Sequence, residues 1–180
     1  MNRTIAHTTP YAWPWDGAFA PTRTALLVVT VPGAPAPVAS VDALAGLLRP
    51  VGGVVVQVTT APPRAAPAAA PVEWAPADHR VESAGVDGFF GSPLDGLLRS
   101  LRRDQLLLAG AWLETSVHST MRSANDRGYE CLLLQDACTA YDPGLAAAAR
   151  SQIEMSGGIF GAVGEIDHVL SALDHERTPA

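Results

Sequence analysis

Lysine is absent from the 180-residue sequence, and all twelve basic residues are arginine. Any mechanism that requires a lysine ammonium group is therefore excluded for this chain. The abundance of alanine, proline and glycine is typical of a GC-rich genome, which explains the composition without reference to function.

Positive charge and long apolar runs are also scarce. The net charge is -6, and no cluster of arginines is expected to form a basic face, so nucleic acid and anionic membranes are not expected as partners. No apolar run approaches 18 residues, and the opening "MNRTIAHTTPYAWPWDG" lacks a hydrophobic core, so neither a transmembrane helix nor a signal peptide is expected. We expect a cytoplasmic protein whose partner is a small molecule or another protein.

The chain offers few metal ligands. Its two cysteines, Cys131 and Cys138, lie in or beside a predicted buried strand without metal-type spacing, and we expect free, buried thiols. No metal or other cofactor is expected, because the remaining histidines apart from His118 form no ligand set: His7, His79, His168 and His175.

Short apolar runs bounded by turns predict buried strands at 24–31, 53–59, 104–110 and 129–136. Amphipathic patterns between them predict helices: "SVDALAGLLR", "SPLDGLLRSLRR" with Ser92 as its N-cap, a helix opened by Ser116 and ending near Gly128, and two further helices near the C-terminus. This alternation predicts a parallel sheet with helices on both faces and a ligand site at the carboxyl ends of the strands.

The predicted organisation is one domain at 24–175, with an aromatic N-terminal arm at 1–23 and a tail at 176–180. The arm contains "YAWPWDG" and is expected to pack on the body or on a second subunit. The segment 61–78 is rich in Pro and Ala, which indicates a long surface loop, with a functional lid as the alternative. Trp74 within this loop is expected to pack on another part of the protein.

Three segments carry a resemblance to a known family: "ALLVVTVPG" (25–33), "FFGSPLDGLLR" (89–99) and "GAWLETSVHSTMRSANDRGYECLLLQDACTAYDP" (110–143). Together they resemble the isochorismatase-like cysteine hydrolases, particularly the branch that cleaves ureidoacrylate and biuret-like amides. The resemblance implies a three-layer, Rossmann-like α/β domain, with a Cys, Asp and Lys triad in active members. The positions that match this triad are Ser116, Thr30 and Ser83, so all three depart from the family pattern.

Residues near Ser116 are candidates for ligand binding: Trp112, Glu114, Thr115, His118 and Phe89. Trp112 stands where the resemblance implies a small residue after a cis peptide bond, so its indole either fills the pocket or offers a stacking platform. A triad of Ser116, His118 and Glu114 is disfavoured because residues two apart on a helix point to different sides.

Three functions follow as hypotheses. The first is a catalytically degenerate protein that binds a ligand or assembles with itself or with an active relative. The second is a repurposed enzyme of a specialised pathway that uses the hydroxyls of Thr30, Ser83 and Ser116. The third is a serine-dependent amide or ester hydrolase, ranked last because a serine hydroxyl needs a positioned base.

Overall fold

The computed structural model describes residues 4–62, 64 and 68–177, and within these residues six parallel strands form one sheet in the order β3-β2-β1-β4-β5-β6. The strands are β1 (Thr24–Thr30), β2 (Val54–Thr59), β3 (His79–Glu82), β4 (Gln105–Ala111), β5 (Glu130–Thr139) and β6 (Ala162–Gly164). The helices are α1 (Ala39–Leu48), α2 (Leu94–Ser100), α3 (His118–Asp126), α4 (Ala146–Glu154) and α5 (Ile166–Arg177). Within the described part of the chain, none of the helices is long and apolar enough to cross a membrane.

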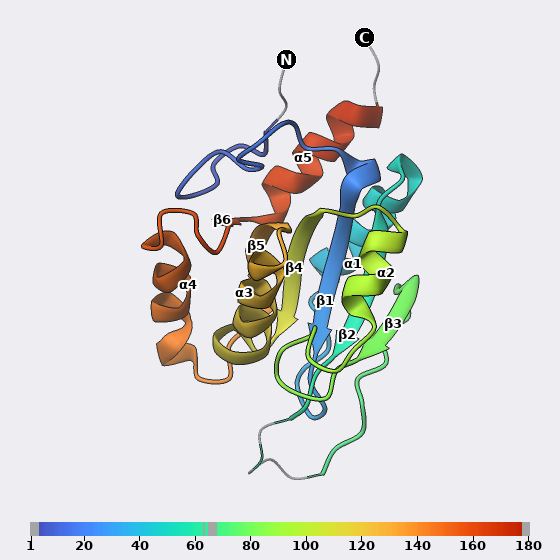
Figure 1. The fold of residues 1–180 in the computed structure, drawn as a ribbon, viewed down its shortest axis with the longest axis vertical. Coiled ribbons are helices and arrows are strands. Elements are labelled where there is room, and N and C mark those ends of the chain that lie inside the picture. Colours follow the sequence, from blue (N-terminus) through green and yellow to red (C-terminus); the bar gives the residue numbers. More distant parts are fainter. Residues whose placement is uncertain (1–3, 63, 65–67, 178–180) are drawn as a thin grey trace.

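The central strands are apolar on both faces because helices cover both sides of the sheet. Every residue of β1 and of β4 is buried. Alternate side chains of β1 join two separate cores, with Leu27 and Val29 facing α2 and α3, and Leu26 and Val28 facing α1 and α5. Figure 1 shows α2, α3 and α4 in front of the sheet and α1 and α5 behind it. The predicted three-layer α/β architecture is confirmed.

The sequence-based boundaries differ from the structure in two ways. The edge strands β3 and β6 were not predicted as apolar runs, because β3 has a single buried residue, Val81, and β6 is only three residues long. Helix α2 begins at Leu94 with Pro93 as its N-cap, so the predicted cap at Ser92 is wrong by one residue. The Ser92 hydroxyl still accepts a hydrogen bond from the Leu94 backbone N–H at 3.3 Å.

The N-terminal arm packs on the body of its own chain. Ile5 and Trp13 are fully buried in the core that contains α5. The backbone of Thr9 exchanges two hydrogen bonds with Val163 of β6, at 2.9 and 2.7 Å. The arm therefore covers the backbone of the last strand at one edge of the sheet, a place where an unpaired strand otherwise invites aggregation.

The strand order fixes where a ligand can bind. The chain winds from β1 toward β3 on one side and then from β4 toward β6 on the other, so the winding direction changes between β1 and β4. In such sheets the crevice lies outside the carboxyl ends of the two strands at this switch point. In Figure 1 these ends point downward, toward the long loop that follows β2.

Candidate functional site

Ser116 lies directly after the switch-point strand β4. It is 2% exposed and belongs to a short π-helical turn, Leu113–Val117, that leads into α3. The expected helix start at Ser116 is therefore wrong, because the helical turn begins three residues earlier and α3 itself begins at His118. The peptide bond between Ala111 and Trp112 is cis.

Gly110 allows the two central strands to come together at this end of the sheet. Its φ of +115° is a conformation that other residues rarely adopt, and a β-carbon built at this position would lie 1.9 Å from the carbonyl oxygen of Val29. Only glycine therefore lets β4 approach β1 where the chain turns toward Ser116.

The hydroxyl of Ser116 has a neutral partner. Thr60 Oγ1 donates a hydrogen bond of 2.9 Å to Ser116 Oγ, and both residues are 2% exposed. Thr60 directly follows β2, and its backbone N–H donates to the carbonyl of Thr30 at 2.9 Å. Thr60 thus connects the end of β1 with the turn that carries Ser116.

Thr30 belongs to a second part of the same polar network. Its Oγ1 accepts a hydrogen bond from Gln57 Nε2 at 3.0 Å and lies 3.2 Å from Oγ1 of Thr59, the residue that pairs with it across the sheet. Gln57 is 3% exposed, donates to the carbonyl of Val72 at 2.5 Å and accepts from the backbone N–H of Trp74 at 3.3 Å. Gln57 therefore anchors the returning end of the Pro/Ala-rich loop to Thr30.

Trp74 is itself buried, as expected from its isolation in the loop. It is 5% exposed, and its indole Nε1–H donates to Asp42 Oδ1 of α1 at 2.6 Å. The C-terminal half of the loop is thus fixed to the body at both Gln57 and Asp42.

Ser83 directly follows β3 and lies at the carboxyl end of the sheet, as Thr30 and Ser116 do. Its backbone N–H donates to the carbonyl of Thr59 at 2.9 Å, while its hydroxyl donates to the carbonyl of Gly85 at 2.7 Å. Among the described residues no hydrogen bond joins the hydroxyls of Thr30, Ser83 and Ser116 to one another directly. All three positions lie at the carboxyl ends of the strands, but each hydroxyl forms hydrogen bonds with its own neighbours.

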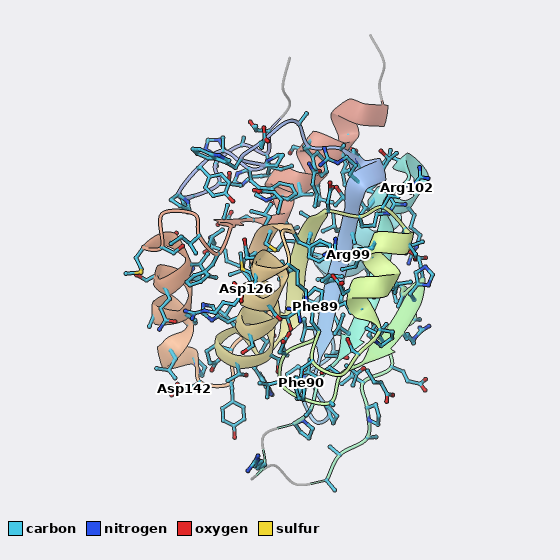
Figure 2. The ribbon with its side chains drawn as sticks, viewed as in Figure 1. Phe89, Phe90, Arg99, Arg102, Asp126 and Asp142 are labelled. Atoms are coloured by element: carbon cyan, nitrogen blue, oxygen red, sulfur yellow. The ribbon has the colours of Figure 1, made fainter. Side chains whose placement is uncertain are left out.

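Glu114 and Trp112 contact the loop that follows β5. The carboxylate of Glu114 accepts the backbone N–H groups of Tyr141 and Asp142 at 3.1 and 2.7 Å. The half-buried Trp112 ring meets the Tyr141 ring edge-on at 5.3 Å, and Tyr141 is 64% exposed. Thr115 is exposed beside them. Trp112 and Tyr141 thus form an accessible aromatic pair at the carboxyl ends of the strands, close in sequence to the buried Ser116. Figure 2 shows Asp142 at this end of the molecule.

The aromatic rings of His118 and Phe89 pack on residues that do not belong to the hydroxyl network. His118 is 7% exposed and meets the Phe160 ring edge-on at 6.3 Å, and burial, followed by the charge of Arg122, lowers its pKa. Phe89 is 5% exposed and stacks on Tyr129 at 5.8 Å. Both aromatic contacts are with residues outside the hydroxyl network.

The network is connected by three residues that were not predicted from the sequence: Gln57, Thr59 and Thr60. The available signal was the polar residues within and after the otherwise apolar run "GVVVQVTT". Because the carboxyl ends of neighbouring parallel strands meet at one edge, Thr59 and Thr60 were bound to lie close to Thr30. The resulting network is built from uncharged hydroxyl and amide groups that are buried and hydrogen-bonded within the protein.

A parallel α/β sheet with a polar site at its switch point defines a class of small-molecule-binding proteins and enzymes. Residues 52–165 match the family model of the isochorismatase domain, and the chain belongs to this family.

A relative in sequence is the ureidoacrylate amidohydrolase RutB of Methylorubrum extorquens, 31% identical over 106 residues, or 58% of this chain. The match spans 43% of the relative's length. In structure the chain is similar to a cysteine hydrolase from Pseudomonas syringae, with a TM-score of 0.71, 17% identity and coverage of 87% of this chain and 95% of the other. It is also similar to the nicotinamidase of Staphylococcus aureus, with a TM-score of 0.59, 18% identity and coverage of 80% and 99%.

Proposed function

We propose that this protein binds a small, uncharged polar ligand at the switch-point site and does not hydrolyse it through a covalent intermediate on Ser116. The observation that carries the proposal is the hydrogen bond from Thr60 to Ser116, which gives the hydroxyl a neutral partner in place of a base. The resemblance to cysteine hydrolases places Ser116, Thr30 and Ser83 at the triad positions. The chain contains no lysine that could supply the third member.

The chemistry of hydroxyl groups supports this proposal. A serine hydroxyl becomes a useful nucleophile only when a positioned base removes its proton. The threonine hydroxyls around Ser116 and Thr30 do not act as bases near neutral pH. Loss of general-base assistance alone costs about a hundredfold to ten thousandfold in rate.

The remaining ionisable groups near Ser116 do not replace the base. Glu114 directs both carboxylate oxygens at backbone N–H groups of the loop after β5. His118 is buried against Phe160, and its Nε2 forms no hydrogen bond with any described residue. A serine-dependent hydrolase therefore remains the least supported of the three hypotheses.

The groups at the site indicate the kind of ligand. The uncharged surroundings of Ser116 suit a neutral ligand, and the exposed edge of the Trp112 and Tyr141 pair suits a planar molecule. Ureidoacrylate and nicotinamide, which give two similar proteins their names, are the natural first probes, with nicotinamide as the uncharged one.

Equilibrium titration with nicotinamide tests the proposal. We expect saturable binding that Trp112→Ala weakens about fivefold, because one aromatic contact contributes roughly 1 kcal/mol. Ser171→Ala, which removes an exposed hydroxyl on α5, serves as the matched control and should bind as the wild type does. Unchanged binding in Trp112→Ala, or conversion of the bound amide to its acid, would contradict the proposal.

A repurposed enzyme is the second candidate, favoured by the retention of polar side chains at buried positions. Thr30 and Ser116 are each 2% exposed, a setting in which an unneeded hydroxyl is readily replaced by an apolar group. Mass spectrometry of probe compounds after prolonged incubation separates the candidates. A new product that disappears with Thr30→Val would favour the enzyme, whereas recovery of unchanged compounds favours binding alone.

Self-association is part of the proposed role. Trp15 and Ile159 are 74% and 70% exposed and line one hollow of about 330 Å³ beside the N-terminal arm. Exposed apolar residues grouped in this way are typical of protein contacts, and we propose a second copy of the chain as the partner. Light scattering should show a dimer or larger assembly that Trp15→Ser with Ile159→Ser dissociates, and a monomeric wild type would refute this part.

A further inference from the structure

Four of the twelve basic residues of this acidic chain surround one pocket far from the hydroxyl network. Arg99, Arg102, Arg103 and Arg127, together with Asp104 and Tyr129, line a pocket of about 330 Å³. Arg99 belongs to α2, while the others come from the loops that precede β4 and β5. Arg99, Arg102 and Arg103 are already close in the sequence, and the expectation that no cluster of arginines forms is wrong at this place.

The pocket lies at the amino ends of the strands, opposite the switch-point site. The loops before β4 and β5 enter these strands at their first residues, Gln105 and Glu130. Figure 2 shows Arg99 and Arg102 along and beyond α2, toward the opposite end of the molecule from Phe90 and Asp142. A ligand in this pocket is therefore separate from one bound near Ser116.

The positive charge at the pocket exceeds the negative charge available to neutralise it. Asp104 pairs with Arg23 at 2.5 Å, and Asp95 pairs with Arg99 at 3.0 Å. Within the described part of the chain, the other three lining arginines, Arg102, Arg103 and Arg127, form no ion pair. In a chain of net charge -6, this local excess of three positive charges attracts an anion.

Arg103 supplies the more specific observation. Its Nε and Nη1 are buried and form no hydrogen bond with any described residue. Buried guanidinium N–H groups without an acceptor are unfavourable, and native structures nearly always satisfy them. The Nε–H and Nη1–H groups point to different sides of the planar guanidinium group, so each needs an acceptor of its own, such as an oxygen of a phosphate.

The neighbouring residues hold the pocket in shape. Arg102 has a φ of +54°, the left-handed conformation in which α2 ends, and the Arg103 backbone N–H donates to the Leu98 carbonyl at 2.9 Å. Arg127 is fixed by a hydrogen bond of 2.8 Å to the carbonyl of Ser123 and by its position over the Phe89 ring, 4.9 Å from the centroid. Arg99 Nη2 donates to the carbonyl of Arg127 at 3.2 Å, which connects α2 to the loop before β5.

We infer that this pocket binds the phosphate group of a small soluble phosphorylated molecule. Three unpaired guanidinium groups match a dianion with several acceptor oxygens better than a single carboxylate, because each phosphate oxygen accepts a separate charge-assisted bond. The volume of about 330 Å³ is at the small end of ligand pockets, which suits a compact phosphate ester.

Isothermal titration of the full chain with inorganic phosphate at constant ionic strength tests the inference. We expect a submillimolar dissociation constant in the wild type, with Arg103→Gln weakening binding at least about tenfold, as loss of a charge-assisted hydrogen bond does. Arg102→Gln should weaken binding in the same way, and since Arg102 is exposed this variant keeps the test valid where Arg103→Gln fails to fold. Arg150→Gln removes one charge from α4, outside the pocket, and should bind phosphate as the wild type does.

Absence of binding at millimolar phosphate, or equal weakening in Arg150→Gln and Arg102→Gln, would overturn the site. A parallel titration with glycerol 3-phosphate should show binding at least as tight as that of phosphate. Sedimentation with phosphatidylcholine vesicles that contain phosphatidic acid distinguishes a lipid headgroup, and binding to vesicles alone would overturn the assignment to a soluble ligand.

Discussion

The Oγ1 of Thr60 donates a 2.9 Å hydrogen bond to the Oγ of Ser116, and this bond joins the end of β2 to the turn after β4. Both side chains are almost completely buried, so neither hydroxyl has water as an alternative partner of equal quality. The relationship makes Ser116 part of a packed network of neutral groups.

Thr60→Val tests the strength of this connection. The substitution keeps the shape of the side chain but removes the donor, which leaves the Ser116 oxygen buried without its partner. We expect the free energy of unfolding to fall by about 1–2 kcal/mol, measured by urea denaturation. Thr115→Val, at an exposed position on the same turn, should change it by less than about 0.5 kcal/mol.

A double substitution makes the same test sharper. The double variant Thr60→Val with Ser116→Ala lacks both polar partners. Its free energy of unfolding should therefore fall by less than the sum of the decreases in the two single variants. Additive losses would show that the two hydroxyls do not interact in solution.

Gln57→Leu is expected to release the Pro/Ala-rich loop. The amide of Gln57 bonds Thr30, the carbonyl of Val72 and the N–H of Trp74, and leucine replaces none of these bonds. Because the chain has no lysine, trypsin cleaves it only after arginine, and Arg64 is exposed in this loop. Cleavage after Arg64 should accelerate several-fold, as local opening becomes less costly.

Gln135→Leu is the matched control for the loop. Gln135 also forms two side-chain hydrogen bonds, to Glu165 and from Arg150, but it lies on β5 away from the loop. Its cleavage rate after Arg64 should equal that of the wild type. If Gln57→Leu is cleaved no faster than Gln135→Leu, the amide does not hold the loop.

His118 should make stability depend on pH below its ordinary pKa of 6.5. Burial and, second, the charge of Arg122 lower the pKa of His118 below its ordinary value of 6.5. Below pH 6.5 the unfolded chain therefore binds a proton that the folded chain excludes, so stability is lost as the pH falls from 6.5 toward the folded-state pKa. His118→Gln should flatten this part of the stability profile, measured by denaturation at several pH values.

His79→Gln provides the comparison, since it removes a histidine from the edge strand β3 and leaves His118 in place. This variant should retain the pH dependence of the wild type. A wild-type profile as flat as that of His118→Gln would show that His118 takes up its proton in the folded protein.

The cysteines should be unreactive in the folded state. Burial, and to a lesser degree the charge of Glu130, raises the pKa of the fully buried Cys131. Burial also raises the pKa of Cys138 to about 12, although its hydrogen bond with the backbone of Gly110 acts in the opposite direction. Thiol reagents act on the thiolate, so Ellman's reagent at pH 8 should label both cysteines quickly only after unfolding in guanidinium chloride.

Cys138 is less buried than Cys131, so it should be the first to react in the native protein. Peptide mapping of the modified chain identifies the order. Rapid labelling of Cys131 before unfolding would contradict the packing described for β5.

The central strands and the layers of this fold were predictable because their apolar runs and helical periodicities are local in sequence. The runs that became β1 and β4 are continuous because both faces are covered, and Leu94 and Leu98 show the helical spacing directly. The edge strand β6 was not predictable, because three residues carry too little pattern and their pairing depends on Thr9, far away in the chain.

The site was predictable in position but not in its connections. The positions of Thr30 and Ser116 followed from strand ends and from the resemblance to a family. The partner of Ser116 is Thr60, 56 residues away, and only the register of β1 and β2 brings it there. The arginine pocket was visible in part as the close spacing of Arg99, Arg102 and Arg103, but Arg127 reaches Arg99 on α2 from the distant loop before β5.

The release of ammonia from nicotinamide and ureidoacrylate by the purified protein tests the central claim most directly. We expect the same background rate for the wild type and for Ser116→Ala, because no base activates this hydroxyl. Ser171→Ala controls for the loss of a serine elsewhere. Steady turnover by the wild type and by Ser171→Ala that Ser116→Ala abolishes would contradict the account and identify Ser116 as a working nucleophile.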